Sequence, residues 1–180
     1  MPDVLTREQR HLNMSRIRGK DTKPEMLLRH GLHALGFRYV LHQRALAGCP
    51  DLAFPRYKAV IFVHGCFWHG HDCHLFKVPG TRTDFWLEKI ARNVERDKKA
   101  FAALRQEGWR VLTIWECALR GTQRINLDKV LGKAKAFLTG SRQVLQVMGK
   151  QAVSSSRSTV SSPCDIDQLP ARCAQGAQRC

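Results

Sequence analysis

A short apolar segment that runs directly into a cluster of histidines and cysteines constrains this chain more than any other feature. Residues 58–63 (KAVIFV) are apolar at nearly every position, which predicts a strand buried on both faces at the centre of a sheet. Six imidazole and thiol side chains follow within eleven positions: His64, Cys66, His69, His71, Cys73 and His74. We therefore expect the functional site at the end of this strand.

The remaining pattern predicts an α/β fold with a mixed central sheet flanked by helices. Thr22 is suited to cap a helix that ends near Gly36, and Gly108 follows a long amphipathic helix. The predicted elements are helices over 22–36, 83–107 and 126–138 and strands over 37–42, 51–54, 58–63 and 109–115. Before them, residues 1–20 form a basic arm. Residues 21–140 then form one folded domain, and residues 141–180, rich in Ser, Gln and Pro, form a disordered tail.

The charge of the chain points to a polyanion partner. Lys and Arg number 30 against 15 Asp and Glu, a formal net charge of +15. Such an excess favours nucleic acid or an acidic membrane surface. No segment approaches the roughly 20 apolar residues of a membrane span, and the first residues lack the apolar core of a signal peptide. We expect a bacterial, cytoplasmic protein that does not enter the membrane.

Cysteine and histidine spacing predicts a structural zinc site. If strand 109–115 lies beside strand 58–63, four soft ligands can meet around one ion: Cys66, His71, Cys73 and Cys117. The odd total of seven cysteines in a chain without a secretion signal favours metal over disulfides. The alternative is that Cys66 and Cys117 are small buried hydrophobic residues. His74 and Cys49 could replace one of the four ligands.

Two histidines remain for chemistry once the zinc ligands are assigned. His64 and His69 would lie near Asp51, at the start of an adjacent strand, and near Glu25. A carboxylate that binds Mg²⁺ beside a histidine that activates water suits phosphodiester hydrolysis. Glu25 could equally be only the glutamate of a capping box, and Asp51 after a proline could be only a turn residue.

Aromatic and polar residues around the same loop suggest contact with DNA. Phe67 and Trp68 are adjacent and cannot both face one core, so they fit stacking on bases or wedging between them. On the long helix, Trp86, Lys89 and Asn93 share one stripe that could present a ring, a cation and an amide to DNA. A solvated helix face is the alternative.

Four segments in this order carry a resemblance to a known family. They are Pro50-Asp51, HGCFWHGHDC (64–73), FKVPGTRTDFWLEKIARNVERD (76–97) and GWRVLTIWECALRG (108–121). Together they resemble the very short patch repair (Vsr) endonuclease family over residues 13–138. The resemblance implies a core fold like that of type II restriction enzymes. It also implies an enzyme that nicks one strand of duplex DNA 5′ to the thymine of a T·G mismatch, which forms when 5-methylcytosine deaminates.

The resemblance also implies residue roles. Asp51 would bind catalytic Mg²⁺, His69 would be the general base, and Glu25 and His64 would assist. Zn²⁺ would be held by Cys66, His71, Cys73 and Cys117, and the duplex would be entered by Phe67, Trp68 and Trp86. A T·G pair is weakly stacked, so wedging there costs less than at a matched pair. In the family, the main-chain carbonyl at the position of Val63 would bind Mg²⁺. Threonine is common at that position.

Two other functions share parts of this pattern. A zinc-stabilised DNA-binding module would need no catalytic histidines, and a restriction endonuclease would cut both strands of matched DNA. The resemblance further implies functional links to a cytosine methyltransferase and to a mismatch-repair protein of the MutL type. We expect a monomer.

Overall fold

The computed structural model describes residues 6, 8–9, 12, 15 and 19–150. Most of the predicted basic arm over 1–20 lies outside the described residues, and so do residues 151–180 of the predicted tail. None of the helices in the described part of the chain is long and apolar enough to cross a bilayer.

A five-stranded mixed sheet forms the centre of the fold, as predicted. Its spatial order follows the chain: β1 (Val40–Leu41), β2 (Leu52–Phe54), β3 (Ala59–His64), β4 (Arg110–Trp115) and β5 (Val144–Val147). The first three strands are antiparallel neighbours, whereas β3, β4 and β5 run parallel. β3 is therefore the central strand, in agreement with its apolar sequence.

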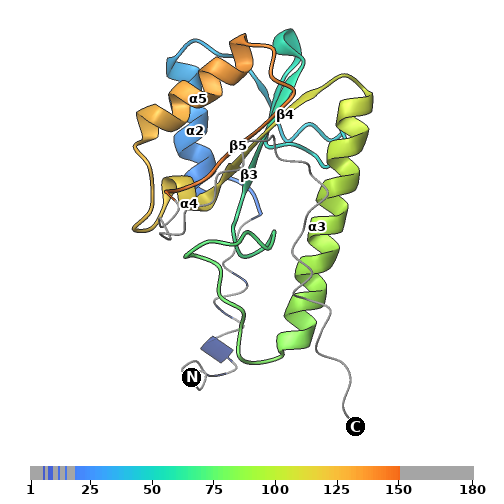
Figure 1. The fold of residues 1–180 in the computed structure, drawn as a ribbon, viewed down its shortest axis with the longest axis vertical. Helices are drawn as coiled ribbons and strands as arrows, with labels where there is room; N and C mark the ends of the chain where they lie inside the picture. The colour runs from blue at the N-terminus through green and yellow to red at the C-terminus, as the bar shows by residue number, and fades with distance from the viewer. Residues whose placement is uncertain (1–5, 7, 10–11, 13–14, 16–18, 151–180) are drawn as a thin grey trace, which may run out of the picture.

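Helices cover the two faces of the sheet unequally. α2 (Lys23–Ala34) and α5 (Leu127–Thr139) lie together on one face, and α3 (Thr83–Gln106) lies on the other (Figure 1). The 24 residues of α3 span about 36 Å at the usual helical rise, whereas six-residue strands such as β3 span about 20 Å. The N-terminal part of α3 therefore extends past the sheet, together with the loop over 65–82 that precedes it.

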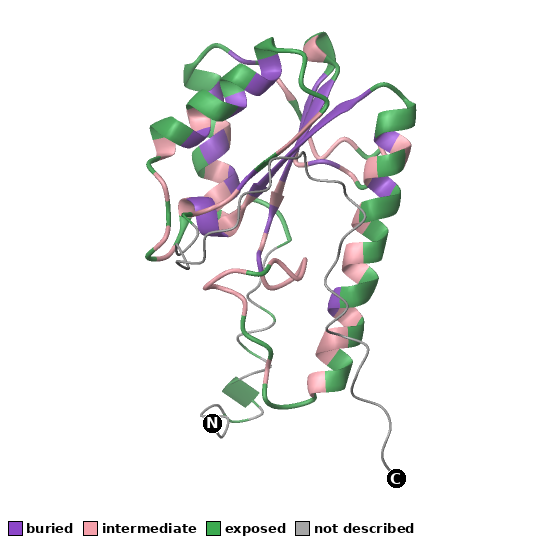
Figure 2. Cartoon of the chain, in the orientation of Figure 1, coloured by how far each residue is buried: buried purple, intermediate pink, exposed green. Residues whose placement is uncertain are grey.

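Alternating side chains of the strands feed two apolar clusters. Ile61, Leu112 and Ile114 pack with Leu28 and Phe137 beneath α2 and α5. The cluster beneath α3 is smaller: Ala53, Val60, Phe62, Leu104, Trp109 and Val111. Figure 2 shows burial concentrated in the sheet, while the projecting part of α3 is mostly exposed or half-buried. The projecting region consequently has little apolar core of its own.

The predicted disordered tail is wrong for its first residues. Residues 144–147 form β5, paired in parallel with β4, and Val147 is buried. The turn that leads into β5 is held by the Arg110 guanidinium, which donates to the main-chain carbonyls of Tyr57, Phe137, Leu138 and Gly140. Because this contact joins distant segments, the local pattern gave no signal for it.

Two further differences concern short elements. The predicted strand over 37–42 is reduced to Val40–Leu41, because Phe37 packs into the apolar cluster as a buried ring against Phe54 and Tyr57. The short helix α4 (Glu116–Leu119) was not expected, and it follows β4 directly. The other strands and helices agree with their predicted ranges to within about two residues.

Candidate active site and metal centre

The four predicted zinc ligands come together in the folded chain. Their ligand atoms all lie within 4.8 Å of one another: Cys66, His71, Cys73 and Cys117. The loop after β3 supplies three of them, and α4 supplies the fourth. His64 and Trp115, the last residues of the parallel neighbours β3 and β4, lie opposite each other. The chain therefore leaves both strands at the same edge of the sheet, which brings the ligands together.

Hydrogen bonds and burial at this cluster fit a metal centre. The Cys66 Sγ accepts a hydrogen bond from the Cys117 N–H, and the Cys117 Sγ accepts one from the Gly149 N–H, each at 3.4 Å. Burial raises the pKa of both thiols and lowers the pKa of the His71 imidazole. An ionised thiolate here thus needs a bound cation. Three thiols and one imidazole match tetrahedral Zn²⁺, and four protein ligands leave no open position, which is typical of a structural site.

The segment after β5 lies against this centre. The Gly149 backbone lies so close that an added Cβ would stand 2.5 Å from the Cys117 carbonyl oxygen. The next residue, Lys150, donates its N–H to the Gln123 carbonyl at 2.7 Å. A part of the chain that was expected to be disordered therefore contributes a hydrogen bond to a thiol of the cluster.

The two alternative ligands, His74 and Cys49, are not part of the cluster. Both ring nitrogens of His74 are buried without a hydrogen-bond partner among the described residues. Its ring packs against Gly121, where an added Cβ would lie 2.3 Å from the His74 Nε2. Cys49 instead lines a cleft beside Asp51. The cluster therefore consists of the four residues that were predicted first as ligands.

This second site is an open cleft of about 260 Å³ at the same edge of the sheet. Asp51, Val63, His64, His69 and Asp97 all line it. The Asp51 Oδ2 accepts a hydrogen bond from the Val63 N–H at 2.7 Å, which fixes the carboxylate against β3. Burial raises the pKa of Asp51 to about 6, and the nearby Glu25 carboxylate adds to the rise. A half-buried carboxylate that faces a cleft is a suitable oxygen ligand for Mg²⁺.

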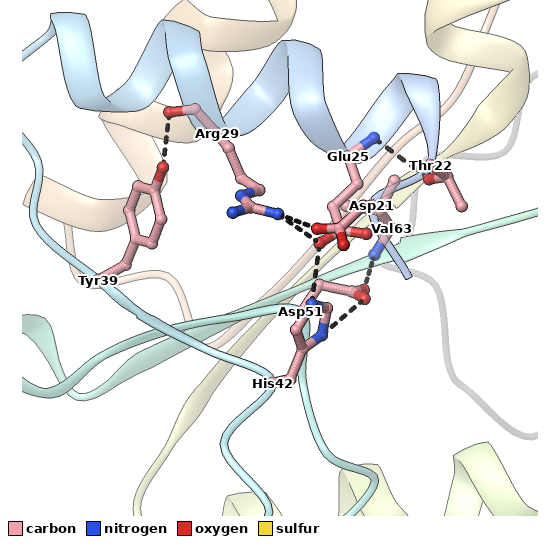
Figure 3. A network of polar contacts seen from close by, with 8 residues as sticks. All are labelled: Asp21, Thr22, Glu25, Arg29, Tyr39, His42, Asp51 and Val63. Atoms are coloured by element: carbon pink, nitrogen blue, oxygen red, sulfur yellow. Dashed lines mark hydrogen bonds and ion pairs between the residues drawn. The ribbon is translucent and has the colours of Figure 1, made fainter. Parts of the chain in front are cut away.

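Glu25 reaches the cleft through a network that Figure 3 shows in detail. Thr22 caps α2 as predicted, since its Oγ1 accepts from the Glu25 N–H at 3.4 Å. The Glu25 side chain is 1% exposed, and its Oε1 lies 3.5 Å from an Arg29 nitrogen and 3.3 Å from the His42 Nε2. The other His42 ring nitrogen lies 4.0 Å from Asp51. His42 therefore lies between the two carboxylates, which the capping-box interpretation of Glu25 does not explain.

A histidine pair forms the opposite wall. The His69 Nδ1 contacts an Asp97 carboxylate oxygen from α3, which fixes the orientation of the ring. The His64 ring stacks on the His69 ring, with centroids 3.7 Å apart and planes within 5°. Burial is the main cause that lowers the pKa of His64 to about 3, so this imidazole is neutral near pH 7. The Nδ1 of His69 is engaged by Asp97, which leaves the Nε2 available for proton transfer.

The aromatic side chains predicted to contact DNA form one cluster on the projecting region. The Phe67 ring centroid lies 5.1 Å from that of Trp68 and 5.5 Å from that of Trp86, and the two indoles lie 6.0 Å apart. The Lys89 Nζ lies 5.3 Å from the Trp68 ring and 5.4 Å from the Trp86 ring. Exposed Phe85 stands next to them. The loop and α3 thus present aromatic rings and a cation together.

The Asn93 side chain makes hydrogen bonds within the chain. Its amide nitrogen donates to the Trp68 carbonyl at 2.9 Å, and its oxygen accepts from Arg96 at 3.0 Å. Both ends of the amide are thus bonded within the chain. Asn93 thus joins the aromatic loop to α3, and its predicted contact with DNA stays a prediction.

Sequence reasoning missed Arg96 and Asp97, which line the cleft, and His42, which lies beside Asp51. Asp97 follows Asn93 by one helical turn, so the same helix periodicity could have found it as an acid that faces the loop. His42 carried no local signal. It adopts a left-handed φ of 46° after β1, and only the pairing of β1 with β2 brings it to Asp51.

Comparisons with known proteins identify the family of the chain. The family model described as DNA mismatch endonuclease Vsr matches residues 2–75. The chain is 43% identical over 147 residues to the DNA mismatch endonuclease Vsr of Escherichia coli K12, which covers 82% of this chain and 94% of the relative. It is 47% identical over 119 residues to the type II nicking enzyme V.XorIIP of Xanthomonas oryzae pv. oryzae, over 66% of this chain and 88% of the relative. The type II nicking enzyme V.NmeAIP of Neisseria meningitidis is 45% identical over 120 residues, which cover 67% of this chain and 86% of the relative. The chain therefore belongs to the Vsr family of DNA mismatch endonucleases and is a DNA endonuclease.

Proposed function

We propose that this protein is a Mg²⁺-dependent repair endonuclease that nicks one strand of duplex DNA 5′ to the thymine of a T·G mismatch. It would act on bacterial DNA in the cytoplasm, on mismatches left by deamination of 5-methylcytosine, with a core fold like that of type II restriction enzymes. The observation that carries the proposal is the shared cleft in which Asp51 faces the His69–Asp97 pair, next to the projecting aromatic cluster. This combination supplies a ligand for a cation, a base and a means of opening a duplex.

The residues of the cleft would share the work of hydrolysis. His69 takes a proton from the attacking water through its Nε2, while Asp97 stabilises the imidazolium through the Nδ1–H. The water oxygen forms a bond to phosphorus as the bond from phosphorus to the 3′ oxygen breaks in line with it, and the 3′ oxygen takes a proton from solvent water and leaves as a hydroxyl. Mg²⁺ bound by Asp51 and the Val63 carbonyl would stabilise the charge that develops on the phosphate oxygens. Neutral His64 and buried Glu25 would position these groups.

The aromatic cluster would make the reaction selective for the mismatch. Phe67, Trp68 and Trp86 can enter a base step, at a cost of a few kcal/mol that is lowest where pairing is already weak. Lys89 lies between these rings and would contact the phosphate backbone as the rings enter. The net charge of +15 supplies the general attraction to DNA.

The metal centre would be structural in this scheme. Zn²⁺ held by the Cys66, His71, Cys73 and Cys117 cluster would supply cross-links between the loop after β3 and α4. That loop carries both His69 and the aromatic pair Phe67 and Trp68, so its order matters to binding and to cleavage. The links to a cytosine methyltransferase and a MutL-type protein, and the monomeric state, rest on the family resemblance alone.

A nicking assay on strand-labelled duplexes tests the proposal. Wild-type protein should nick only the thymine strand of a T·G duplex, with added Mg²⁺ and not with a chelator. Asp51→Ala should bind the duplex but lose cleavage, whereas Asp128→Asn, an exposed acid at the start of α5, should cut normally. Equal cutting of a matched C·G duplex would identify a restriction enzyme. Binding without cutting, across varied flanking sequences, would identify a DNA-binding module.

A further inference from the structure

One indole lies between the metal centre and the catalytic cleft. Trp115 ends β4, directly opposite His64 at the end of β3. Its ring stacks on the His71 ring, with centroids 4.2 Å apart and planes within 14°. It also meets the His64 and His69 rings edge to face, at 5.4 Å and 6.5 Å. In the described part of the chain, the aromatic neighbours of Trp115 are thus three imidazoles, from two different sites.

A hydrogen bond to the neighbouring strand β5 fixes the orientation of this indole. The Trp115 Nε1–H donates to the Gln146 Oε1 at 3.0 Å. Gln146 belongs to β5, in register with Thr113 of β4. The hydrogen bond and the stack on His71 together restrict the angle of this half-buried ring.

The angle of the indole decides how two imidazoles are presented. His71 Nδ1 lies 3.6 Å from the Cys117 Sγ, so a tilt of this ring would move a donor of the metal cluster. On the other side, His69 contacts Asp97 and the stacked His64 ring, and its ring lies at a steep angle to the Trp115 ring. Rotation of Trp115 would thus disturb both sites together.

We infer that Trp115, latched by Gln146, is a positioning residue that holds the His71 ring of the metal centre and the His69 ring of the cleft in one fixed arrangement. The inference rests on the proposed roles of His71 and His69. It goes beyond those roles, because it states that metal retention and the rate of cleavage both depend on the Trp115 side chain. Gln146 lies in β5, within the segment that was predicted to be disordered.

Four variants test the inference. Trp115→Ala removes the stack, and Trp115→Phe keeps a ring but loses the donor. Gln146→Leu removes the acceptor, and Gln146→Glu keeps one. Trp109→Ala is the matched control for the loss of an indole, because it lies at the other end of β4 in the cluster beneath α3. Gln143→Leu is the matched control for the glutamine, since among the described residues its side-chain amide donates to the nearby Ser141 carbonyl and to no other group.

Two independent readouts are needed. The first is the rate at which the DNA-free, zinc-loaded protein releases zinc to a chelator, which we expect to rise about 10- to 100-fold for Trp115→Ala. The second is single-turnover nicking at saturating protein, which we expect to fall about 100-fold for Trp115→Ala while affinity for the mismatch duplex stays the same. Gln146→Leu should change both rates about fivefold, and Gln146→Glu should restore them.

Ring orientation can be followed directly by NMR of histidine-labelled protein. Gln146→Leu should shift the ring resonances of His71, His69 and His64, and leave those of His30 and His33 on α2 in place. If Trp115→Ala matches Trp109→Ala in both rates, or Gln146→Leu matches Gln143→Leu, the inference is wrong. Should Trp115→Ala fail to fold, Trp115→Phe and the glutamine variants decide by the same criteria.

His69→Ala separates this inference from the proposed function. If His69→Ala cuts at the wild-type rate, the proposed base is wrong, and zinc release still decides whether Trp115 positions His71. If His69→Ala is inactive while the Trp115 and Gln146 variants behave like their controls, the proposed function stands and the positioning role is refuted.

Discussion

The metal cluster and the Asp51 cleft lie at the same edge of the sheet but are assembled in opposite ways. Three of the four cluster ligands lie in one short loop, with Cys66 and Cys117 buried and His71 and Cys73 half-buried. The cleft draws on segments far apart in the chain: α2, the turn after β1, the start of β2, the end of β3 and α3. The first site can order its own loop once an ion binds, whereas the second depends on the whole fold. Four predictions test this contrast, from the largest expected effect to the smallest.

Loss of zinc should have the largest effect, because the projecting loop has little apolar core to replace it. Removal of the metal, or Cys66→Ser, should lower the free energy of unfolding by at least about 4 kcal/mol, the range typical of a lost structural metal. Mismatch binding and nicking should disappear together, since Phe67, Trp68 and His69 share that loop. Thermal unfolding and binding assays would measure both effects. Cys49→Ser, which removes a thiol outside the metal cluster, is the control for stability. A metal-stripped protein as stable and active as the loaded one would contradict the prediction.

Changes to the His69–Asp97 pair should affect the cleft alone. His69→Ala removes the proposed base and should slow single-turnover nicking by about 10² to 10⁴-fold. Asp97→Asn leaves the base in place but removes the charge that orients it, so we expect a loss of about 10- to 100-fold. Glu95→Gln, an exposed acid of the same helix, is the control. Zinc content and mismatch affinity should stay at the wild-type level, and a loss of zinc in Asp97→Asn would show that the two sites are not separable in this way.

The raised pKa of Asp51 makes the cleft a source of instability in the absence of Mg²⁺. Because the pKa of Asp51 in the fold is about 6, above its ordinary value, the folded state binds this proton more tightly than the unfolded state. The stabilisation that the bound proton gives to the fold is fully present below the ordinary pKa of an aspartate, and it is lost as pH rises through about 6. Asp51→Asn should therefore be more stable than wild type at neutral pH, by up to about 3 kcal/mol. The difference should vanish near pH 4.

Chemical denaturation from pH 4 to 8 without added Mg²⁺ measures this difference. Asp128→Asn should show no comparable dependence on pH. Added Mg²⁺ should stabilise wild type and leave Asp51→Asn unchanged. If Asp51→Asn is less stable than wild type at pH 7, the fold accommodates the ionised carboxylate without a cost in stability, and the prediction is wrong.

Val63→Thr should have the smallest effect. The contact of Val63 with Asp51 is made by its main-chain N–H, and the proposed contact with Mg²⁺ is made by its carbonyl. Neither depends on the side chain, so nicking should change by less than about threefold, or roughly 0.7 kcal/mol. A much larger change in single-turnover rate would show that the hydroxyl takes part in the cleft.

Much of the fold and of the metal centre was predictable because the signals were local. The apolar run before His64 predicted a central strand, and the spacing of Cys66, His71 and Cys73 predicted a metal loop. The cleft was predictable only in part. Asp51 and His69 were found, but His42 and Asp97 were not, because their roles follow from strand pairing and from the packing of α3 against the loop.

The sequence by itself determined the order of elements, the central strand and the ligand types of the metal loop. These follow from hydrophobic periodicity and from residue chemistry over short spans, which need no knowledge of distant contacts. Only the tertiary structure decided that residues 144–147 form a fifth strand, and that Trp115 lies between His71 and the histidines of the cleft. The physical reason is that β3, β4 and β5 pair in parallel. Parallel pairing brings together strand ends that are far apart in the chain, and no local pattern encodes which side chains then meet.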